Sequence, residues 1–290
     1  MRESTQYKIF RILNVIIMLL IVAVTLYPFL YVLAQSLSSE KYIYAGQVNI
    51  IPKGFTFKTY QIVMQEKDFW TGYKNTIIYT LLGTAISLFM TTILAYPLSK
   101  KRLKGKSFFL AFTVFTMFFN GGIIPNYVIV KGLGMRNTIW AVLVPGAIST
   151  YNMIIMKTFF QGLPDELEEA ASVDGMNTFQ ILLKIILPLS KPIMATMALF
   201  YAVGSWNSWF GAFLYFDNKQ LFPVTLYLRN IVAGAQQTSV SSGSSSDDLA
   251  QIAATVKSAT IILTVLPILC VYPFIQKYFV TGVMIGSVKG

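Results

Sequence analysis

The sequence predicts an all-α integral membrane protein with six transmembrane helices, on three observations. Hydrophobic residues form 55% of the 290-residue chain and charged residues only 12%, whereas a soluble domain carries roughly 25% charged residues. Several apolar runs reach the roughly 20 residues that a helix needs to cross the hydrocarbon core of a bilayer. Lysine and arginine gather in short segments between these runs, and this bias places both termini in the cytoplasm.

The first span is expected at about residues 12–34, after a basic N-terminal tail. A secretory signal peptide has an apolar core of about 7–15 residues, so the longer run here indicates a retained helix. Pro28 lies inside it and predicts a kink. Residues 1–34 therefore form the tail and first span, residues 35–74 an outer loop, and residues 75–290 a core domain of five spans.

The second span, at about residues 75–98, ends at a strongly basic loop. Five of the seven residues from Lys100 to Lys106 are Lys or Arg, which favours a cytoplasmic position. Gly105-Lys106-Ser107 resembles the end of a phosphate-binding loop, but such a loop needs a glycine at position 100 and a preceding strand. Lys100 occupies that position, so nucleotide binding is excluded here.

The next two spans carry predicted breaks. The third, at about residues 107–130, is interrupted at positions 120–122. One interpretation is a frayed helix end. The alternative is a bent segment that lines an aqueous path, because irregular backbone at membrane depth persists only against protein or water. The fourth span, at about residues 138–160, has a break at Pro145-Gly146.

The fifth span is expected to start after Pro192 and to end near residue 215, and the last to cover about residues 258–279. Residues 216–257 between them read as an outer segment with a flexible, Ser-rich stretch.

Composition excludes most site chemistry. The chain has no histidine and one cysteine, Cys270, so an intrachain disulfide and a Cys/His metal site are excluded. No nucleophile has a recognisable partner, so the chain is not expected to be an enzyme. Almost no acidic residue lies in an expected span, which disfavours a proton-driven carrier.

The loop at residues 161–190, between the fourth and fifth spans, predicts a helix, a glycine elbow and a second helix. Pro164 suits the first turn of a helix, and acidic residues follow it at the positive end of the helix dipole. Gly175 suits the helix stop, where a left-handed residue is needed. Thr178 is expected to cap the second helix, which runs to Pro188.

The first helix of this loop has one face that carries small side chains. Its spacing brings together Leu167, Ala170, Ala171 and Asp174. The two alanines leave a shallow surface that another backbone can approach closely. A plain surface helix that stops at a glycine is the alternative interpretation of this stretch alone.

The loop also carries an extended motif. Its fixed positions match E-A-A-x3-G-x9-I-x-L-P at Glu169, Ala170, Ala171, Gly175, Ile185, Leu187 and Pro188. The sequence thereby resembles the ABC importer permeases, and the resemblance implies a type I ABC importer permease fold with a cytoplasmic coupling helix in its core permease domain. It implies that the first four residues form the helix and elbow that dock into an ATPase subunit. The last three would anchor the loop to the fifth span.

Further stretches resemble the carbohydrate branch of these importers: FFNGGIIPNY, NMIIMKTFF, SWNSWFGAFLY and GVMIGSVKG. They are similar to the second permease of the maltose type, and more closely to permeases for complex oligosaccharides such as that of the alginate importer. The resemblance implies a bacterial cytoplasmic-membrane protein that forms a heterodimer with a homologous permease. It also implies two cytoplasmic ATPase subunits, which bind ATP and Mg, and an extracytoplasmic solute-binding protein, with no cofactor in this chain. The complex would import oligosaccharides, among them acidic fragments such as alginate, by alternating access.

Residues of the substrate path follow from sugar chemistry. Aromatic faces stack on sugars and amides hydrogen-bond to them, so the candidates are Asn120, Trp206, Asn207 and Trp209. The alternative for the two tryptophans is helix packing or interface anchoring. Two other functions stay open: an importer of a non-sugar solute, and an ATP-independent channel or carrier.

Overall fold

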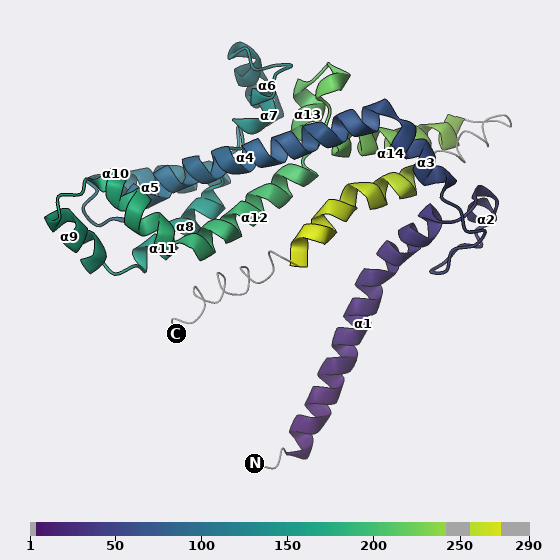
Figure 1. The fold of residues 1–290 in the computed structure, drawn as a ribbon, viewed down its shortest axis with the longest axis horizontal. Helices are drawn as coiled ribbons and strands as arrows, with labels where there is room; N and C mark the ends of the chain where they lie inside the picture. The colour runs from purple at the N-terminus through teal and green to yellow at the C-terminus, as the bar shows by residue number, and fades with distance from the viewer. Residues whose placement is uncertain (1–3, 242–255, 274–290) are drawn as a thin grey trace. The chain divides into compact units, whose positions relative to one another are not determined.

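The computed structural model describes residues 4–241 and 256–273, and every regular element in these two ranges is helical (Figure 1). Two compact units are distinguished by the contacts within the chain. The first holds the residues up to Phe69 and those from Leu228 to Leu266, and the second holds Trp70–Tyr227 and the residues from Pro267. The predicted all-α fold class is confirmed for the described part of the chain.

Three helices are long and apolar enough to cross a membrane: Gln6–Ser36 within α1 (Thr5–Ser36), α4 (Lys67–Ser99) and Val256–Pro273. Two bent pairs also qualify when each is taken as one crossing. They are α5 (Lys106–Phe118) with α6 (Ile123–Gly132), bent by 115°, and Thr178–Leu189 with α12 (Lys191–Asn207), bent by 84°. The described residues thus hold three to five candidate spans, against six predicted. The expected end of the last span, residues 274–279, lies outside the described residues.

The predicted breaks explain most of this difference. Gly122, between α5 and α6, has a left-handed φ of +91°. Pro145 separates α7 (Trp140–Leu143) from α8 (Thr150–Gln161), because proline has no N–H to continue a helix. The 12 residues of α8 extend only about 18 Å, so the expected fourth span consists of two helices that are each too short to cross alone.

The expected outer loop at residues 35–74 is partly helical. It contains α2 (Glu40–Tyr44) and α3 (Lys58–Gln65), and α4 already begins in it at Lys67. The end of α1 is tied to α3 by a hydrogen bond of 2.7 Å between the hydroxyls of Ser36 and Tyr60. Most of α1 itself exposes its apolar side chains, as a lipid-facing helix does.

Polar side chains of α4 hold the irregular segment before α14 (Val224–Ser241). The Asn75 amide donates to the carbonyl oxygen of Gln220 at 2.6 Å, and the Thr76 hydroxyl accepts from the Val224 N–H at 2.8 Å. A Cβ at Gly72 would lie 3.1 Å from the backbone of Val224, so a glycine allows this close approach. These bonds satisfy backbone groups of the segment that no helix pairs. The helix α14 itself was not predicted; residues 216–257 were expected to form an outer segment with a flexible, Ser-rich stretch.

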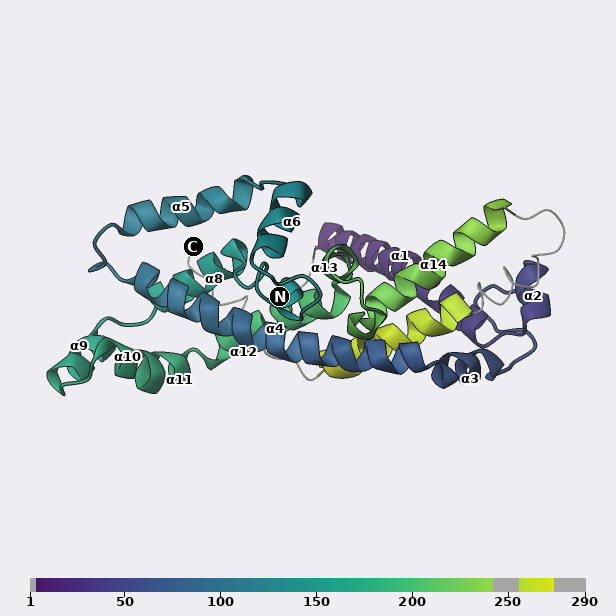
Figure 2. The same ribbon diagram turned by 90° about the horizontal axis from the view of Figure 1, so that it is seen from above.

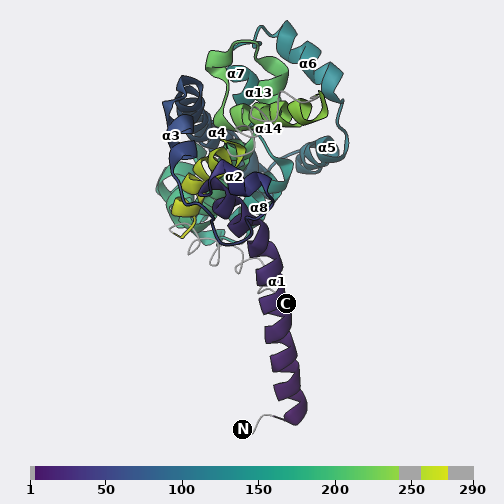
Figure 3. The same cartoon turned by 90° about the vertical axis from the view of Figure 1, so that its right-hand side faces the viewer.

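Apolar packing in the second unit forms two clusters. One joins α4, α8 and α12 to two helices of the loop, α9 (Glu166–Val173) and α10 (Thr178–Ile181). The other joins α4 to α6, α7 and α13 (Phe210–Tyr215), and α7 and α13 lie side by side (Figures 1 and 3). Because the first cluster includes α9 and α10, the loop at residues 161–190 is packed onto the helices and is not a detached hairpin.

A polar clasp closes the second cluster. The Asn137 side chain accepts from the N–H of Asp217 at 2.6 Å, and its amide donates to the Asp217 carboxylate at 3.0 Å. The hydrogen bond that the Asn137 amide donates to this carboxylate, and the one from the Arg136 guanidinium, hold the pKa of Asp217 below its usual range. The contribution of the clasp to stability is therefore complete above the usual aspartate pKa of about 3.9 and is lost as the pH falls through the lowered pKa.

We expect Asn137→Ala to destabilise the protein more than Asn137→Gly. Both variants lose the amide contacts, but Asn137 has a left-handed φ of 58°, which costs an alanine about 1–2 kcal/mol and a glycine almost nothing. Thermal unfolding of the purified protein at neutral pH measures the difference. Equal midpoints for the two variants would contradict the backbone argument.

Candidate functional site

The loop at residues 161–190 forms the predicted helix, elbow and second helix. α9 is followed by an elbow at Gly175, by α10, by a π-helical turn, η1 (Leu182–Ile186), and by α11 (Leu187–Leu189). These elements lie together beside the C-terminal end of α4 (Figures 1 and 2). The wide turn of η1 precedes Pro188, whose ring would clash with the carbonyl of Lys184 in a regular α-helix.

Gly175 ends α9 as predicted. Its φ is +82°, a conformation that side chains with a Cβ rarely adopt. The Met176 N–H donates to the carbonyl of Ala171 at 3.0 Å, and the Gly175 N–H donates to that of Ser172 at 3.1 Å. These two bonds form a Schellman motif, which satisfies the last carbonyl groups of the helix.

The cap of the second helix differs from the prediction by one residue. Asn177, rather than Thr178, is the N-cap: its side chain accepts from the Gln180 N–H at 2.9 Å, and the Gln180 side chain accepts from the Asn177 N–H at 3.0 Å. Thr178 is the first helical residue. The capping box formed by Asn177 and Gln180 satisfies two donors instead of one, which explains the choice.

The predicted small-residue face of α9 is divided between two sides of the helix. Ala171 is buried in the first cluster, with Glu168 beside it, so the expectation that Ala171 lies on the open surface is wrong. Ala170, Glu169 and Asp174 are exposed. Helix spacing alone does not say which side of α9 faces the protein; the packing of α9 against α10 and η1 decides it.

The outer side of the loop presents apolar side chains to the surroundings. Val173 is 88% exposed and Phe179 is 61% exposed, and Leu167 is 40% exposed. The three anchor candidates lie on the other side or at its edge: Ile185 and Leu187 pack against the first cluster, and Pro188 is exposed. We refer to Leu167, Val173 and Phe179 as the apolar patch of the loop.

A buried ion pair fixes α9 to the end of α4. Lys100 pairs with Glu168, and their side chains are only 12% and 9% exposed. The Lys100 ammonium also lies 5.2 Å from the ring centroid of Tyr96, within the range of a cation–π interaction. A second pair, Lys101 with Asp165 at 3.5 Å, is largely exposed and contributes little to stability.

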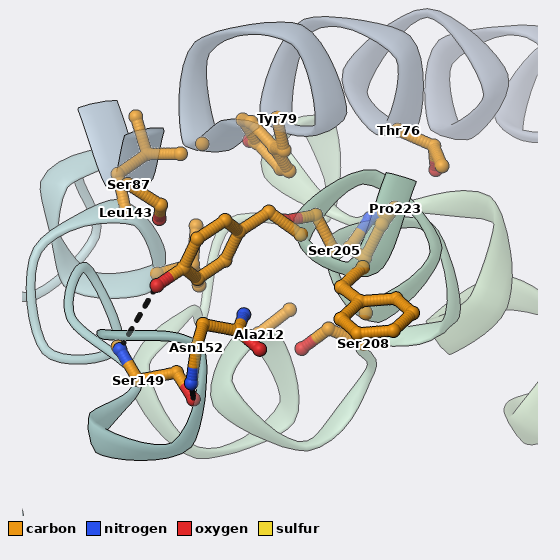
Figure 4. A pocket seen from close by; sticks show the side chains of 16 residues that line it. Thr76, Tyr79, Ser87, Leu143, Ser149, Asn152, Ser205, Ser208, Ala212 and Pro223 are labelled. Atoms are coloured by element: carbon orange, nitrogen blue, oxygen red, sulfur yellow. Dashed lines mark hydrogen bonds between the residues drawn. The ribbon is translucent and has the colours of Figure 1, made fainter. Parts of the chain in front are cut away.

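A cavity of about 370 Å³ lies between α4, α12 and the start of α8 (Figure 4). Its polar lining consists of Thr76, Tyr79, Ser87, Ser149, Asn152, Tyr201, Ser205 and Ser208. The Tyr201 hydroxyl forms a hydrogen bond of 2.6 Å with the Thr91 hydroxyl and accepts one of 3.2 Å from the Ser149 N–H. Among these residues only Ser205 and Ser208, in the SWNSWFGAFLY stretch around Trp206, were noted from the sequence. For the others, the only sign of a cavity was a neutral polar residue inside an apolar run.

A second cavity of about 510 Å³ lies at the break between α5 and α6 and shares Ser149 with the first. It is lined by Asn120, one of the predicted substrate-path residues. The Asn120 side chain accepts from the Gly122 N–H at 3.0 Å and so holds the break open as a turn. Of the two interpretations of this break, the bent segment therefore fits the structure better than a frayed helix end.

Among the other substrate-path candidates, the two tryptophans lie in helix packing and Asn207 is exposed at the end of α12. Trp206 is buried and meets the ring of Tyr73 edge-on at 5.9 Å, and Trp209 contacts Phe210. The Asn207 amide donates to the carbonyl of Val203 in its own helix at 2.9 Å. Neither cavity is lined by these three residues. Within the described residues, no group of three or more His, Cys, Asp or Glu side chains is placed to hold a metal ion.

Comparison with known proteins gives consistent matches over nearly the whole chain. The family model of the binding-protein-dependent transport system inner membrane component matches residues 80–285. Protein LplC of Bacillus subtilis (strain 168) is 41% identical over 290 residues, which cover 100% of this chain and 98% of that protein. The polygalacturonan/rhamnogalacturonan transport system permease protein YtcP of the same organism is 38% identical, over 94% of this chain and 96% of that protein.

A solved structure agrees with these matches. In the crystal structure of a bacterial ABC transporter involved in the import of the acidic polysaccharide alginate, one chain superposes with a TM-score of 0.87. That chain is 33% identical, and the match covers 96% of this chain and 99% of the other.

Proposed function

Because the chain belongs to the family of binding-protein-dependent transport system inner membrane components, we propose that it carries polysaccharide fragments into a bacterial cell. It is the permease of an ABC importer for oligosaccharides in the inner membrane, and ATP hydrolysis lies in partner subunits. Polygalacturonan, rhamnogalacturonan and alginate, which the similar proteins' names mention, support polysaccharide fragments, including acidic ones, as the substrate class.

The proposed complex contains a homologous permease, two ATPase subunits and a solute-binding protein. The chain would cross the membrane six times: α7 and α8 together form the fourth crossing, and α12 forms the fifth without the Thr178–Leu189 part of its bent pair. Both termini and the loop at residues 161–190 would then lie in the cytoplasm. The basic residues between α4 and α5 support this orientation.

The single observation that carries the proposed coupling role is the apolar patch on the loop. Val173 and Phe179 are exposed on a segment that also carries five carboxylates, at positions 165, 166, 168, 169 and 174. A segment with this much charge does not lie in the hydrocarbon, so lipid does not cover the patch. A protein partner is the occupant that fits, and Glu169, Ala170 and Gly175 are exposed on the same loop. We therefore place the ATPase subunit against α9 and the elbow, while Ala171, Ile185 and Leu187 hold the loop on the permease.

We expect Val173→Asp to abolish co-purification of the ATPase subunits and sugar uptake without lowering the unfolding temperature of the permease. Val173 is 88% exposed, so the aspartate costs the free chain little, whereas an unpaired charge buried in an interface is strongly unfavourable. Uptake of radiolabelled oligogalacturonides into proteoliposomes that contain the complete complex and ATP measures transport.

Leu133→Asp is the matched control, because Leu133 is 64% exposed beyond the end of α6 and lies on the side that the proposed topology places outside. It should retain the ATPase subunits. Normal ATPase recruitment by Val173→Asp would contradict the docking role. Uptake by the chain alone, without ATPase subunits, would favour a channel or carrier instead.

A further inference from the structure

The cavity between α4, α8 and α12 contains polar groups that the protein itself does not satisfy. Asn152 is 6% exposed and Ser87 is 5% exposed. Within the described residues, the Asn152 side-chain amide and the Ser87 hydroxyl make no hydrogen bond; only the backbone N–H of Asn152 is paired, with Ser149. Neither group is among the unpaired polar atoms that are fully shielded from solvent, so both are open to the cavity and available to a molecule in it.

Both groups face the same space. Asn152 and Ser87 line the cavity from two different helices, α8 and α4, and the Asn152 amide projects toward its middle (Figure 4). The serines at positions 205 and 208 add hydroxyls from the end of α12. Tyr201 differs from them, because its hydroxyl is already engaged by Thr91 and by the Ser149 N–H. Tyr201 therefore holds the lining helices together, whereas Asn152 and Ser87 are available to a molecule in the cavity.

The lining defines the chemistry of that molecule. All 16 lining residues are uncharged, so the cavity offers no counter-ion for a carboxylate or an ammonium group. It combines hydroxyl and amide groups with the aromatic rings of Tyr79, Phe200 and Tyr201. Its volume of about 370 Å³ lies near the lower end of the range of ligand pockets, roughly 300–1,000 Å³.

We propose that this cavity is a binding site for one neutral, hydroxyl-rich part of the transported saccharide, with Asn152 and Ser87 as the hydrogen-bonding residues. The proposal rests on the proposed transport function and adds residues that sequence reasoning did not single out. Because the site recognises hydroxyls and not charge, it takes neutral and acidic oligosaccharides alike, and discrimination for uronate carboxylates is left to other parts of the complex.

The test compares Asn152→Leu and Ser87→Ala with the wild-type complex in proteoliposomes. The probes are radiolabelled tetragalacturonate and galactotetraose, supplied at saturating binding protein with ATP inside. We expect each variant to lower the initial uptake rate of the transported probe about tenfold, as the loss of one hydrogen bond predicts. The unfolding temperature should stay the same or rise, since each substitution removes a polar group that the protein does not pair.

The control is Thr158→Val, which lies in the same helix but is exposed outside both cavities and bonds only to its own helix. It should import at the wild-type rate. Wild-type uptake by both cavity variants would overturn the proposal, and so would a fall in unfolding temperature that parallels the loss of uptake, because that result assigns a structural role. Should Asn152→Leu fail to fold, Ser87→Ala, which removes one oxygen atom, decides alone. Absence of ATP-dependent uptake of either probe by the wild-type complex would instead contradict the proposed function.

Discussion

Replacing Glu168 with alanine is expected to destabilise the second unit by about 3–5 kcal/mol, because Lys100 would remain buried without its partner. Both side chains are largely shielded from water, and the penalty for desolvating the two charges is offset only while both are present. The Lys100 ammonium keeps its position over the Tyr96 ring, but a cation–π contact replaces only part of the lost attraction. α9 is then expected to leave the end of α4, and the ATPase subunits should no longer co-purify.

Two comparisons separate the ion pair from the surrounding packing. Lys100→Met with Glu168→Leu removes both charges, and the double variant should unfold at a temperature close to that of the wild type, since apolar replacements of buried pairs are often neutral. Asp165→Ala is the matched single control, because its pair with Lys101 is exposed, and its effect should be small. A double variant as unstable as Glu168→Ala would show that volume, and not charge, is what the site requires.

The same ion pair shows where reading the sequence reaches its limit. Lys100 was assigned to the positive-inside bias and Glu168 to the acidic run after Pro164, and both assignments remain compatible with the structure. Their partnership was not predictable, because the two residues are far apart in the sequence and each has a sufficient local explanation. Only the packing of α9 onto the end of α4 brings them together.

Breaks and turns of the backbone were more predictable than which side of a helix is buried. Gly175 and Pro145 act through restrictions of their own φ angles, so the elbow and the break in the fourth span follow from the residue type. The inward position of Ala171 depends on α10 and η1, which helix spacing in α9 does not encode. The same reason applies to Asn152, since a single amide in an apolar run does not reveal that its side chain lines a cavity.

Gly175→Pro is expected to abolish the elbow and to cost about 3 kcal/mol or more. Proline requires a φ near −65° where the chain has +82°, and it removes the N–H that donates to the carbonyl of Ser172. It also disfavours the backbone conformation of Asp174 before it, whose ψ of 4° lies far from the extended region that a residue before proline adopts. Without the turn, α9 and α10 cannot both pack on the first cluster, so transport and ATPase recruitment should be lost together.

A graded series at this position tests the cause, because a Cβ at Gly175 would meet no atom within 4 Å. Steric contact therefore does not contribute, and the backbone angle alone should order the variants. Gly175→Asn tolerates the left-handed region and should cost least, Gly175→Ala about 1–2 kcal/mol, and Gly175→Pro most. Unfolding temperature and ATPase co-purification should fall in that order. If alanine were as harmless as asparagine, the elbow would not need its left-handed residue, and the motif glycine would have to act through direct contact with the ATPase subunit.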